Sequence, residues 1–334
     1  MKTIDIAHKT VAISRTDSIG DVVLTLPICA WIKNNYPQTK IIFFCKSYTL
    51  EVLKCYPYID EIVCVDQWEG VSDQEKIAQL KTLSIHTFIH VFPNKELAHF
   101  VKKAKIPYRI GTSHRWFHWL TCNIRPDFTR KNSNHHEAQL NFELLRTIGV
   151  EKLPSRTELA TLISAFAPQE KLNPFLEEVL RNDYKKVVLH TKSQGSAVEW
   201  PIEKYIALSH QLLEKGYCVY FSGTEKEGQL FRSALPKHPQ IIDVSGKSTV
   251  GELIAFLAQC DALVACSTGP LHLAAAVGIK AIGLYTDLRP MHPGRWAPIG
   301  KNTVALTLQN ETNPTLEDIN LISVEQVLAV LVDE

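Results

Sequence analysis

Residues 10–24 have the sequence Thr-Val-Ala-Ile-Ser-Arg-Thr-Asp-Ser-Ile-Gly-Asp-Val-Val-Leu, an apolar run, a polar segment and a second apolar run. The first run predicts a buried strand at residues 10–13, and a helix is expected to begin at Gly20. The apolar residues of this helix recur three, four, seven and eight positions apart and so share one face: Leu24, Pro27, Ile28, Trp31 and Ile32. We expect Pro27 to bend the helix mildly. The polar segment then lies at the carboxyl end of a strand, where open α/β sheets bind ligands.

The same alternation of strand and helix continues along both halves of the chain. Further strands are predicted at residues 40–45, 61–65, 87–91, 186–190, 217–221, 241–244, 262–266 and 281–285. Helices are predicted at residues 202–215, 225–234, 250–259, 270–277 and 323–332. This order is typical of α/β proteins with parallel sheets that helices cover on both faces. We therefore predict two doubly wound Rossmann-like domains.

The domain boundary is predicted from a change of pattern in residues 151–184. This stretch holds three prolines and has no strand before Val187, so it is interpreted as an inter-domain connection with a helix at residues 174–181. The predicted domains are residues 1–165 and 166–322, and residues 323–334 form a terminal helix that could pack on the first domain. Ligands of such proteins are expected in a cleft between the two domains.

Composition excludes several classes of protein. The 334 residues carry a formal charge of +1, which excludes attachment to nucleic acid by bulk charge. The eight cysteines form no CxxC pair and several lie in apolar runs, which argues against a zinc site and fits a reducing, cytoplasmic compartment. The N-terminus lacks a secretory apolar region, and we expect no membrane-spanning helix.

Asp21 is the first candidate for chemistry. It follows Gly20 in the first predicted helical turn, where it could act as a general base or simply favour the helix dipole, and position alone does not separate the two interpretations. Asp17 or Ser18 is expected to cap this helix. The segment is not a GxGxxG fingerprint, so it does not predict a dinucleotide grip.

The second half holds the candidates for binding an anion. Residues 267–272 (Ser-Thr-Gly-Pro-Leu-His) combine hydroxyls, a glycine and a helix start, which favours a phosphate site, although Thr268 could merely cap the helix and His272 could be structural. Residues 190–196 (His-Thr-Lys-Ser-Gln-Gly-Ser) also suit a phosphate, but a solvated loop is the commoner explanation. Glu227 could accept the hydroxyls of a ribose, although an exposed glutamate is commoner at a helix start.

Basic and aromatic residues gather in the first half, and an anionic partner could dock on them although most such clusters are solvated faces. They are Lys102, Lys103, Lys105, Arg109, His114, Arg115, Trp116, His118, Trp119, Arg125, Arg130, Lys131, His135 and His136.

These segments together resemble glycosyltransferase family 9, the ADP-heptose:lipopolysaccharide heptosyltransferases. The specific matches are residues 14–27 (SRTDSIGDVVLTLP) and residues 267–276 (STGPLHLAAA). Residues 93–95, 109–111 and 199–201 support them, and the Pro93 segment is more similar to heptosyltransferase II than to heptosyltransferase I. The resemblance implies a GT-B fold whose first domain binds the acceptor and whose second domain binds the nucleotide sugar. It also implies an inverting transfer without metal or cofactor, from ADP-heptose or a similar donor to the lipopolysaccharide core, in the cytoplasm with peripheral contact at the inner face of the inner membrane, and without nucleic acid.

The resemblance also implies roles for single residues. Asp21 matches the catalytic aspartate. The donor-binding candidates are Thr191, Lys192, Ser193, Glu227, Ser248, Ser267, Thr268, Gly269 and His272. The acceptor-binding candidates are Ser18, Gly20, Arg109 and Arg115.

Two positions depart from the family pattern. Val198 stands where the family often has a cation near the diphosphate, and Ser267 stands where it often has an aspartate. We expect the first change to weaken stabilisation of the leaving group unless Lys192 substitutes, and the second to compensate in part by removing repulsion. These two departures keep a non-catalytic sugar-nucleotide-binding protein as an alternative, and a sugar-nucleotide epimerase or hydrolase is another because it can share the same architecture.

Overall fold

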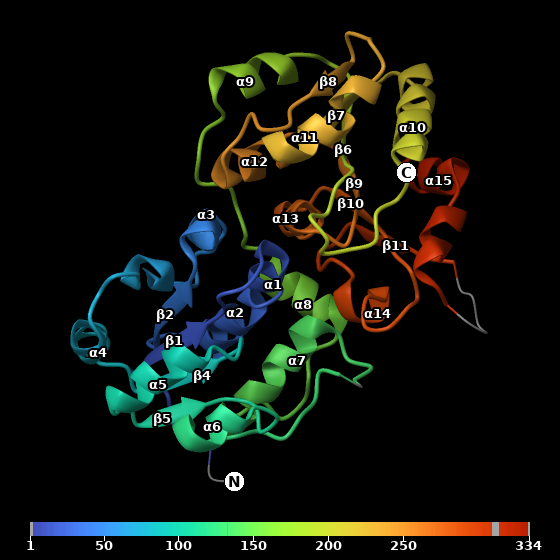
Figure 1. Cartoon of the computed structure of the whole chain (residues 1–334). Helices are drawn as coiled ribbons and strands as arrows, with labels where there is room; N and C mark the ends of the chain where they lie inside the picture. Colours follow the sequence, from blue (N-terminus) through green and yellow to red (C-terminus); the bar gives the residue numbers. More distant parts are fainter. Residues whose placement is uncertain (1–2, 132, 309–313, 333–334) are drawn as a thin grey trace. The chain divides into compact units, whose positions relative to one another are not determined.

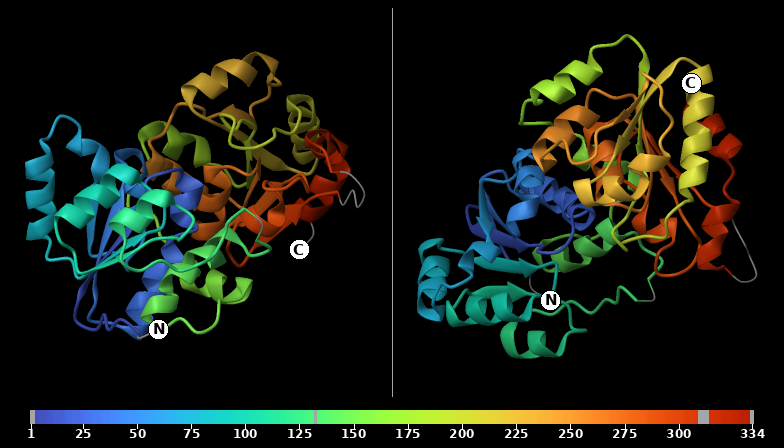
Figure 2. Two further views of the ribbon diagram at one scale, coloured as in Figure 1. Left: turned by 60° about the horizontal axis from the view of Figure 1, so that its bottom comes forward. Right: turned by 45° about the horizontal axis from the view of Figure 1, so that its top comes forward.

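The computed structural model describes residues 3–131, 133–308 and 314–332. The chain divides into two compact units, Met1–Ala165 and Phe166–Glu334 (Figure 1). Each unit is a parallel sheet with helices on both faces, as predicted from the alternating pattern (Figure 2). Among the described residues, no helix combines the length and hydrophobicity that crossing a bilayer requires. All eight cysteines are buried thiols.

The sheet of the first unit has the strand order β3-β2-β1-β4-β5 within the described residues. Its strands are β1 (Thr10–Ser14), β2 (Lys40–Cys45), β3 (Glu61–Cys64), β4 (Thr87–His90) and β5 (Tyr108–Ile110). Its helices are α1 (Ile19–Val23), α2 (Leu26–Asn35), α3 (Leu50–Lys54), α4 (Asp73–Thr82), α5 (Lys95–Lys103), α6 (Trp116–Thr121), α7 (Glu137–Glu143) and α8 (Arg156–Ile163), with short 3-10 segments at Ser47–Thr49, Val65–Trp68 and Leu144–Ile148. The central strand β1 lies between β2 and β4, where the order reverses. Open sheets of this kind bind ligands at that reversal.

The sheet of the second unit has the order β11-β10-β9-β6-β7-β8 in the described part of the chain. Its strands are β6 (Lys185–His190), β7 (Tyr217–Ser222), β8 (Ile241–Asp243), β9 (Ala262–Cys266), β10 (Lys280–Leu284) and β11 (Thr303–Leu306). Its helices are α9 (Pro174–Leu180), α10 (Ile202–Glu214), α11 (Glu225–Phe231), α12 (Val250–Leu257), α13 (Gly269–Val277), α14 (Pro293–Trp296) and α15 (Val324–Val332), with 3-10 segments at Arg232–Ala234 and Leu316–Leu321. Here the order reverses between β6 and β9.

Pro27 interrupts the first predicted helix instead of bending it. The structure has two helices, α1 and α2, and Pro27 occupies the first turn of the second. Proline has no N–H to donate to the carbonyl of Val23, so a continuous helix would lose that bond, whereas the first turn of a new helix needs none. The Thr25 hydroxyl donates to the carbonyl of Asp21 (2.8 Å) at the break.

Two other expectations differ from the structure. The predicted connection at residues 151–184 contains α9, as expected, but also α8, which packs against α2 in the first unit. Ser155 and Glu158 form a capping box on α8, a pattern visible in the sequence. The terminal helix, for which packing on the first domain was considered, instead packs through α15 on α10 and β10 of the second unit.

Candidate active site

Asp21 lies on α1, immediately after the central strand of the first unit. The hydroxyl of Ser18 is the N-cap of α1, accepting from the Asp21 backbone N–H (3.5 Å) and donating to Asp21 Oδ2 (2.5 Å). The capping role expected for Asp17 or Ser18 thus belongs to Ser18. Gly20 is buried beside Asp21, whose side chain is 18% exposed. The Asp21 carboxylate is therefore positioned at the ligand-binding edge of the sheet without being sealed from solvent.

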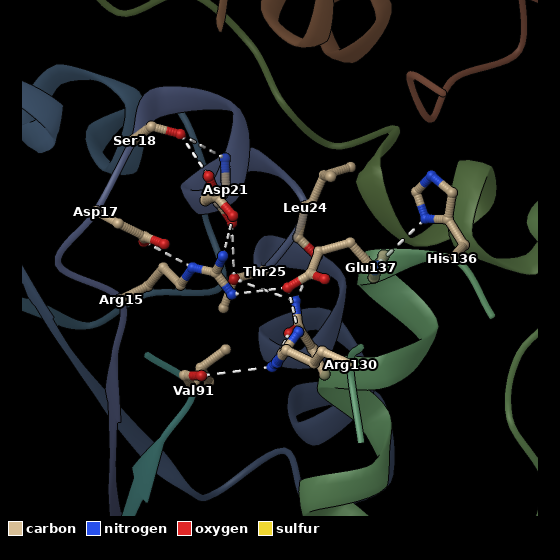
Figure 3. A network of polar contacts seen from close by, with 12 residues as sticks. Arg15, Asp17, Ser18, Asp21, Leu24, Thr25, Val91, Arg130, His136 and Glu137 are labelled. Atoms are coloured by element: carbon tan, nitrogen blue, oxygen red, sulfur yellow. Dashed lines mark hydrogen bonds and ion pairs between the residues drawn. The ribbon is translucent and has the colours of Figure 1, made fainter. Parts of the chain in front are cut away.

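Arg15 is the centre of a polar network around this carboxylate (Figure 3). Its side chain is 4% exposed, and its guanidinium donates to Asp21 Oδ1, to Asp17 Oδ1 (2.7 Å) and to Glu137 Oε1 (3.2 Å). Burial by itself lowers the pKa of Arg15, but the negative charges of Asp21, Asp17 and Glu137 raise it by more. The pKa therefore lies above its usual value, and the guanidinium stays charged. Burial raises the pKa of Asp17 to about 6, against the opposing effect of Arg15. Arg15 therefore fixes the orientation of Asp21.

Glu137 joins this network to α7. It is 1% exposed and accepts from Arg130 as well as from Arg15. Arg130 also donates to Asn141 Oδ1 (3.0 Å), and the Asn141 amide donates to the carbonyl of Leu24 (3.0 Å), between α1 and α2. Sequence reasoning missed Arg15, Glu137 and Asn141. No local pattern marks the contact between Arg15 and Glu137, because it spans 122 residues of sequence.

The predicted acceptor-binding residues divide into two groups. Ser18 and Gly20 lie with Asp21, as described above. Arg109 is on β5, and its guanidinium donates to the carbonyls of Thr121 (2.7 Å) and Ile106, so it ties the edge strand to its neighbours. Arg115 is the exposed N-cap of α6. The structure does not bring Arg109 or Arg115 into contact with Asp21.

The basic set predicted as an anionic docking face is smaller than expected. Arg109 and Arg130 are engaged by carbonyls and a carboxylate, and His118 and His136 are buried. His136 caps α7 through its ring nitrogen, which accepts from the N–H of Ala138 (3.2 Å). Each of these four side chains already has a partner within the protein, so none of them is available to an anionic ligand at the surface.

Two threonine hydroxyls that lack a hydrogen-bond partner among the described residues lie at one edge of the sheet of the second unit. Thr191 directly follows β6, and Thr268 lies two residues after β9, the neighbouring strand. Both side chains are buried, and within the described residues neither hydroxyl has a hydrogen-bond partner. Buried hydroxyls are costly without partners, so these two make this edge a candidate site for a polar ligand.

The helix that follows Thr268 supplies further donors at the same edge. Thr268 is the N-cap of α13 by position, but its side chain makes no capping bond. Helix capping therefore does not explain why a threonine stands here. Gly269 begins the helix, Ser267 is half-buried before it, and His272 is buried in its first turns. The first backbone N–H groups of a helix have no partner inside the helix, and they attract anions.

Glu199 organises the loop after β6. Its carboxylate accepts from Lys192 Nζ (2.9 Å), from the Ser193 backbone N–H (2.8 Å) and from the Ser193 hydroxyl (3.1 Å). These bonds hold the pKa of Glu199 below its usual value although burial raises it. Lys192, the expected substitute for the cation missing at Val198, is thus present but ion-paired.

Glu227 and Ser248 lie in the segments that follow β7 and β8, the next two strands of the sheet after β6. Glu227 is buried at the start of α11, where Oε2 accepts from the backbone N–H (2.7 Å) and the hydroxyl (2.9 Å) of Thr224. This capping box occupies Oε2, so a ribose contact would use Oε1. Ser248 is half-buried in the loop between β8 and α12, and β8 lies two strands away from β6 in the sheet.

Comparison with known proteins assigns the family. The model of glycosyltransferase family 9 (heptosyltransferase) matches residues 95–323. The chain belongs to glycosyltransferase family 9. Among relatives of this family 9 chain, a Haemophilus influenzae protein named "Putative glycosyltransferase" is 28% identical over 297 residues, 86% of either chain. The lipopolysaccharide core heptosyltransferase OpsX of the same species is 24% identical, over 91% of this chain and 86% of OpsX.

A solved structure shows the fold of this family 9 chain. Escherichia coli heptosyltransferase WaaC with ADP superposes with a TM-score of 0.71 and 17% identity, covering 96% of this chain and 98% of WaaC. The fold is of the GT-B class, as the resemblance implied, and the protein is a transferase enzyme.

Proposed function

We propose that this enzyme transfers a heptose from ADP-heptose to a hydroxyl of the lipopolysaccharide inner core, with inversion and with Asp21 as the general base. The observation that carries the proposal is the Asp21 carboxylate, held by Arg15 and Ser18 at the strand reversal of the first sheet. The names of two similar proteins support the substrates, since OpsX is a lipopolysaccharide core heptosyltransferase and WaaC was solved with ADP.

In the proposed reaction Asp21 takes the proton of the acceptor hydroxyl while the oxygen attacks the anomeric carbon. The bond from that carbon to the diphosphate breaks, and its electron pair leaves with ADP. A carboxylate has about four lone-pair sites, so Asp21 can keep its bonds to Arg15 and Ser18 and still accept the proton. Attack on the face opposite ADP inverts the anomeric centre.

The second unit is proposed to bind the donor. Thr191, Thr268 and the N-terminus of α13 would bind the diphosphate and stabilise the charge that grows on it, without a metal ion. Glu227 Oε1 would accept from the ribose. Because Lys192 is paired with Glu199, the hydroxyls and helix N–H groups would carry more of this stabilisation than in relatives with a cation at the position of Val198.

The test compares Asp21→Asn with a matched variant, Asp17→Asn. Both carboxylates bind Arg15, but only Asp21 is proposed to move a proton. We expect Asp21→Asn to lower transfer about 10²–10⁴-fold, with ADP affinity by calorimetry unchanged, and Asp17→Asn to lower it much less. Equal losses in the two variants would assign the effect to Arg15 and contradict the role of Asp21 as base.

The place of action follows from the substrates. A nucleotide sugar and a nascent glycolipid core would meet at the inner face of the inner membrane, and we propose that the enzyme works there from the cytoplasm.

A further inference from the structure

Helix α6 turns its apolar side outward. Trp116, Trp119 and Leu120 are 65%, 61% and 63% exposed, and their spacing of three and four residues puts them on one face. His118 and Thr121, the polar residues of the same helix, are buried instead. An amphipathic helix of a water-soluble domain has the opposite orientation, so α6 presents a surface that favours contact with something other than water.

Cations flank these exposed rings. Lys95 Nζ lies 5.0 Å from the centre of the Trp116 ring, and Arg125 Cζ lies 4.6 Å from that of Trp119. Arg115, the N-cap of α6, is exposed beside Trp116. We call this set the α6 surface: Lys95, Arg115, Trp116, Trp119, Leu120 and Arg125.

One acid near this surface, Asp127, is bonded to its own neighbours rather than to the three cations. Asp127 accepts from the Ser113 hydroxyl (2.7 Å) and lies 3.0 Å from His114 Nε2. Trp119 donates its indole N–H to the carbonyl of Ser113 (2.8 Å), so its ring is held at the surface by its polar end. The α6 surface thus combines amphipathic aromatic rings, one leucine and net positive charge.

This combination fits an anionic bilayer better than a second copy of the chain. Tryptophan rings settle at the interface between headgroups and acyl chains, and basic residues beside them are attracted to anionic headgroups. In a symmetric dimer the same cations would instead face one another. Three side chains on a six-residue helix also fall short of the roughly 800 Å² per partner that stable protein interfaces bury.

We propose that the α6 surface binds the headgroup region of anionic membranes and inserts Trp116, Trp119 and Leu120 between the lipids. Figure 1 places α6 on the outside of the first unit, beside α5. This contact goes beyond the transfer reaction and does not depend on it, because it requires neither the donor nor the glycolipid acceptor.

Vesicles that contain no lipopolysaccharide test the proposal. The full-length enzyme is sedimented with phosphatidylcholine vesicles holding 30% phosphatidylglycerol or none, and tryptophan quenching by bromine-labelled acyl chains reports insertion. We expect binding to the anionic vesicles only, a loss of about fivefold for each of Lys95→Gln, Arg115→Gln and Arg125→Gln, and a loss of at least about tenfold for the double variant Trp116→Ser, Trp119→Ser.

A matched pair of leucines controls for general stickiness. Leu120→Ser should weaken binding, whereas Leu321→Ser, which removes an equally exposed leucine (60%) from the second unit, should not. Circular dichroism verifies that each variant is folded. Binding that survives the double tryptophan variant would overturn the proposal. So would self-association in centrifugation that the same variant abolishes, since it would assign the surface to a second copy.

Discussion

Replacing Glu137 by Gln tests whether the network around Asp21 stabilises the first unit. Glu137 is buried and accepts from two guanidiniums, those of Arg15 and Arg130. The substitution keeps the shape of the side chain but removes the negative charge and one acceptor oxygen. Both arginines donate to Oε1, which Gln retains, so the change leaves two guanidiniums with one negative charge fewer in a place that water hardly reaches.

The magnitude follows from what the two arginines retain. Removing one partner of a buried ion pair costs about 3–5 kcal/mol when the other charge is left alone. Arg15 keeps Asp17 and Asp21, and Arg130 is 24% exposed and keeps Asn141. The expected loss is therefore lower, about 2–3 kcal/mol. For a unit of this size it lowers the melting temperature by about 5–10 °C.

The assay is urea unfolding with calorimetry as a second measurement, because the two units can unfold separately. Glu61→Gln is the control, since its pair with Lys40 (2.6 Å) is exposed and should cost at most about 1 kcal/mol. Arg130→Met should cost less in the Glu137→Gln background than alone. If Glu137→Gln were no more destabilising than Glu61→Gln, the network would not hold the first unit together.

Two further predictions concern buried polar groups that have no hydrogen-bond partner within the part of the chain that the structure describes. Thr191→Val and Thr268→Val should leave stability unchanged or raise it slightly, because each removes an unpaired hydroxyl, but should weaken ADP binding about tenfold each. The control Thr249→Val removes the N-cap of α12, so it should lower stability and leave ADP binding unchanged. Unchanged ADP affinity in the first two variants would exclude the donor site proposed here. Burial, with His118 and Arg109 nearby, holds the pKa of His90 well below its usual value, so below about pH 6.5 the unfolded chain binds more protons and stability falls as pH falls. His90→Phe should remove up to about 1.4 kcal/mol of this loss per pH unit, measured by urea unfolding at pH 7.5 and pH 5, and equal pH dependence in both proteins would refute it.

Most of the fold could be predicted from local patterns. The strand at Thr10–Ser14, the helix at Pro174–Leu180 and the repeated β-α order of the second unit follow from apolar periodicity and helix-start residues. The edge strands β5 and β11 were missed because they are short and partly exposed, so alternation is hardly visible in them. Helix α8 was missed although Ser155 and Glu158 formed a readable cap, because prolines around it outweighed that signal.

The site could be predicted only in part, for a different reason. Asp21, Thr191 and Thr268 stand next to strand ends in the sequence, so topology alone places them at ligand-binding edges. Glu137 lies far from Arg15 in sequence and has the type and setting of any glutamate in a first helical turn. A contact of this kind depends on how the chain returns to the sheet, which no local pattern encodes.

The two units differ in how far each completes the bonding of its own candidate residues. In the first unit Asp21 already bonds to Arg15 and Ser18, and Arg15 is itself fixed by Glu137. If Asp21 is the base, as proposed, it is already oriented and needs no reorganisation when the acceptor arrives. In the second unit the hydroxyls of Thr191 and Thr268 have no partner among the described residues. A ligand with oxygens that accept from both hydroxyls would recover their desolvation cost, which is the physical reason for proposing the donor site at this edge.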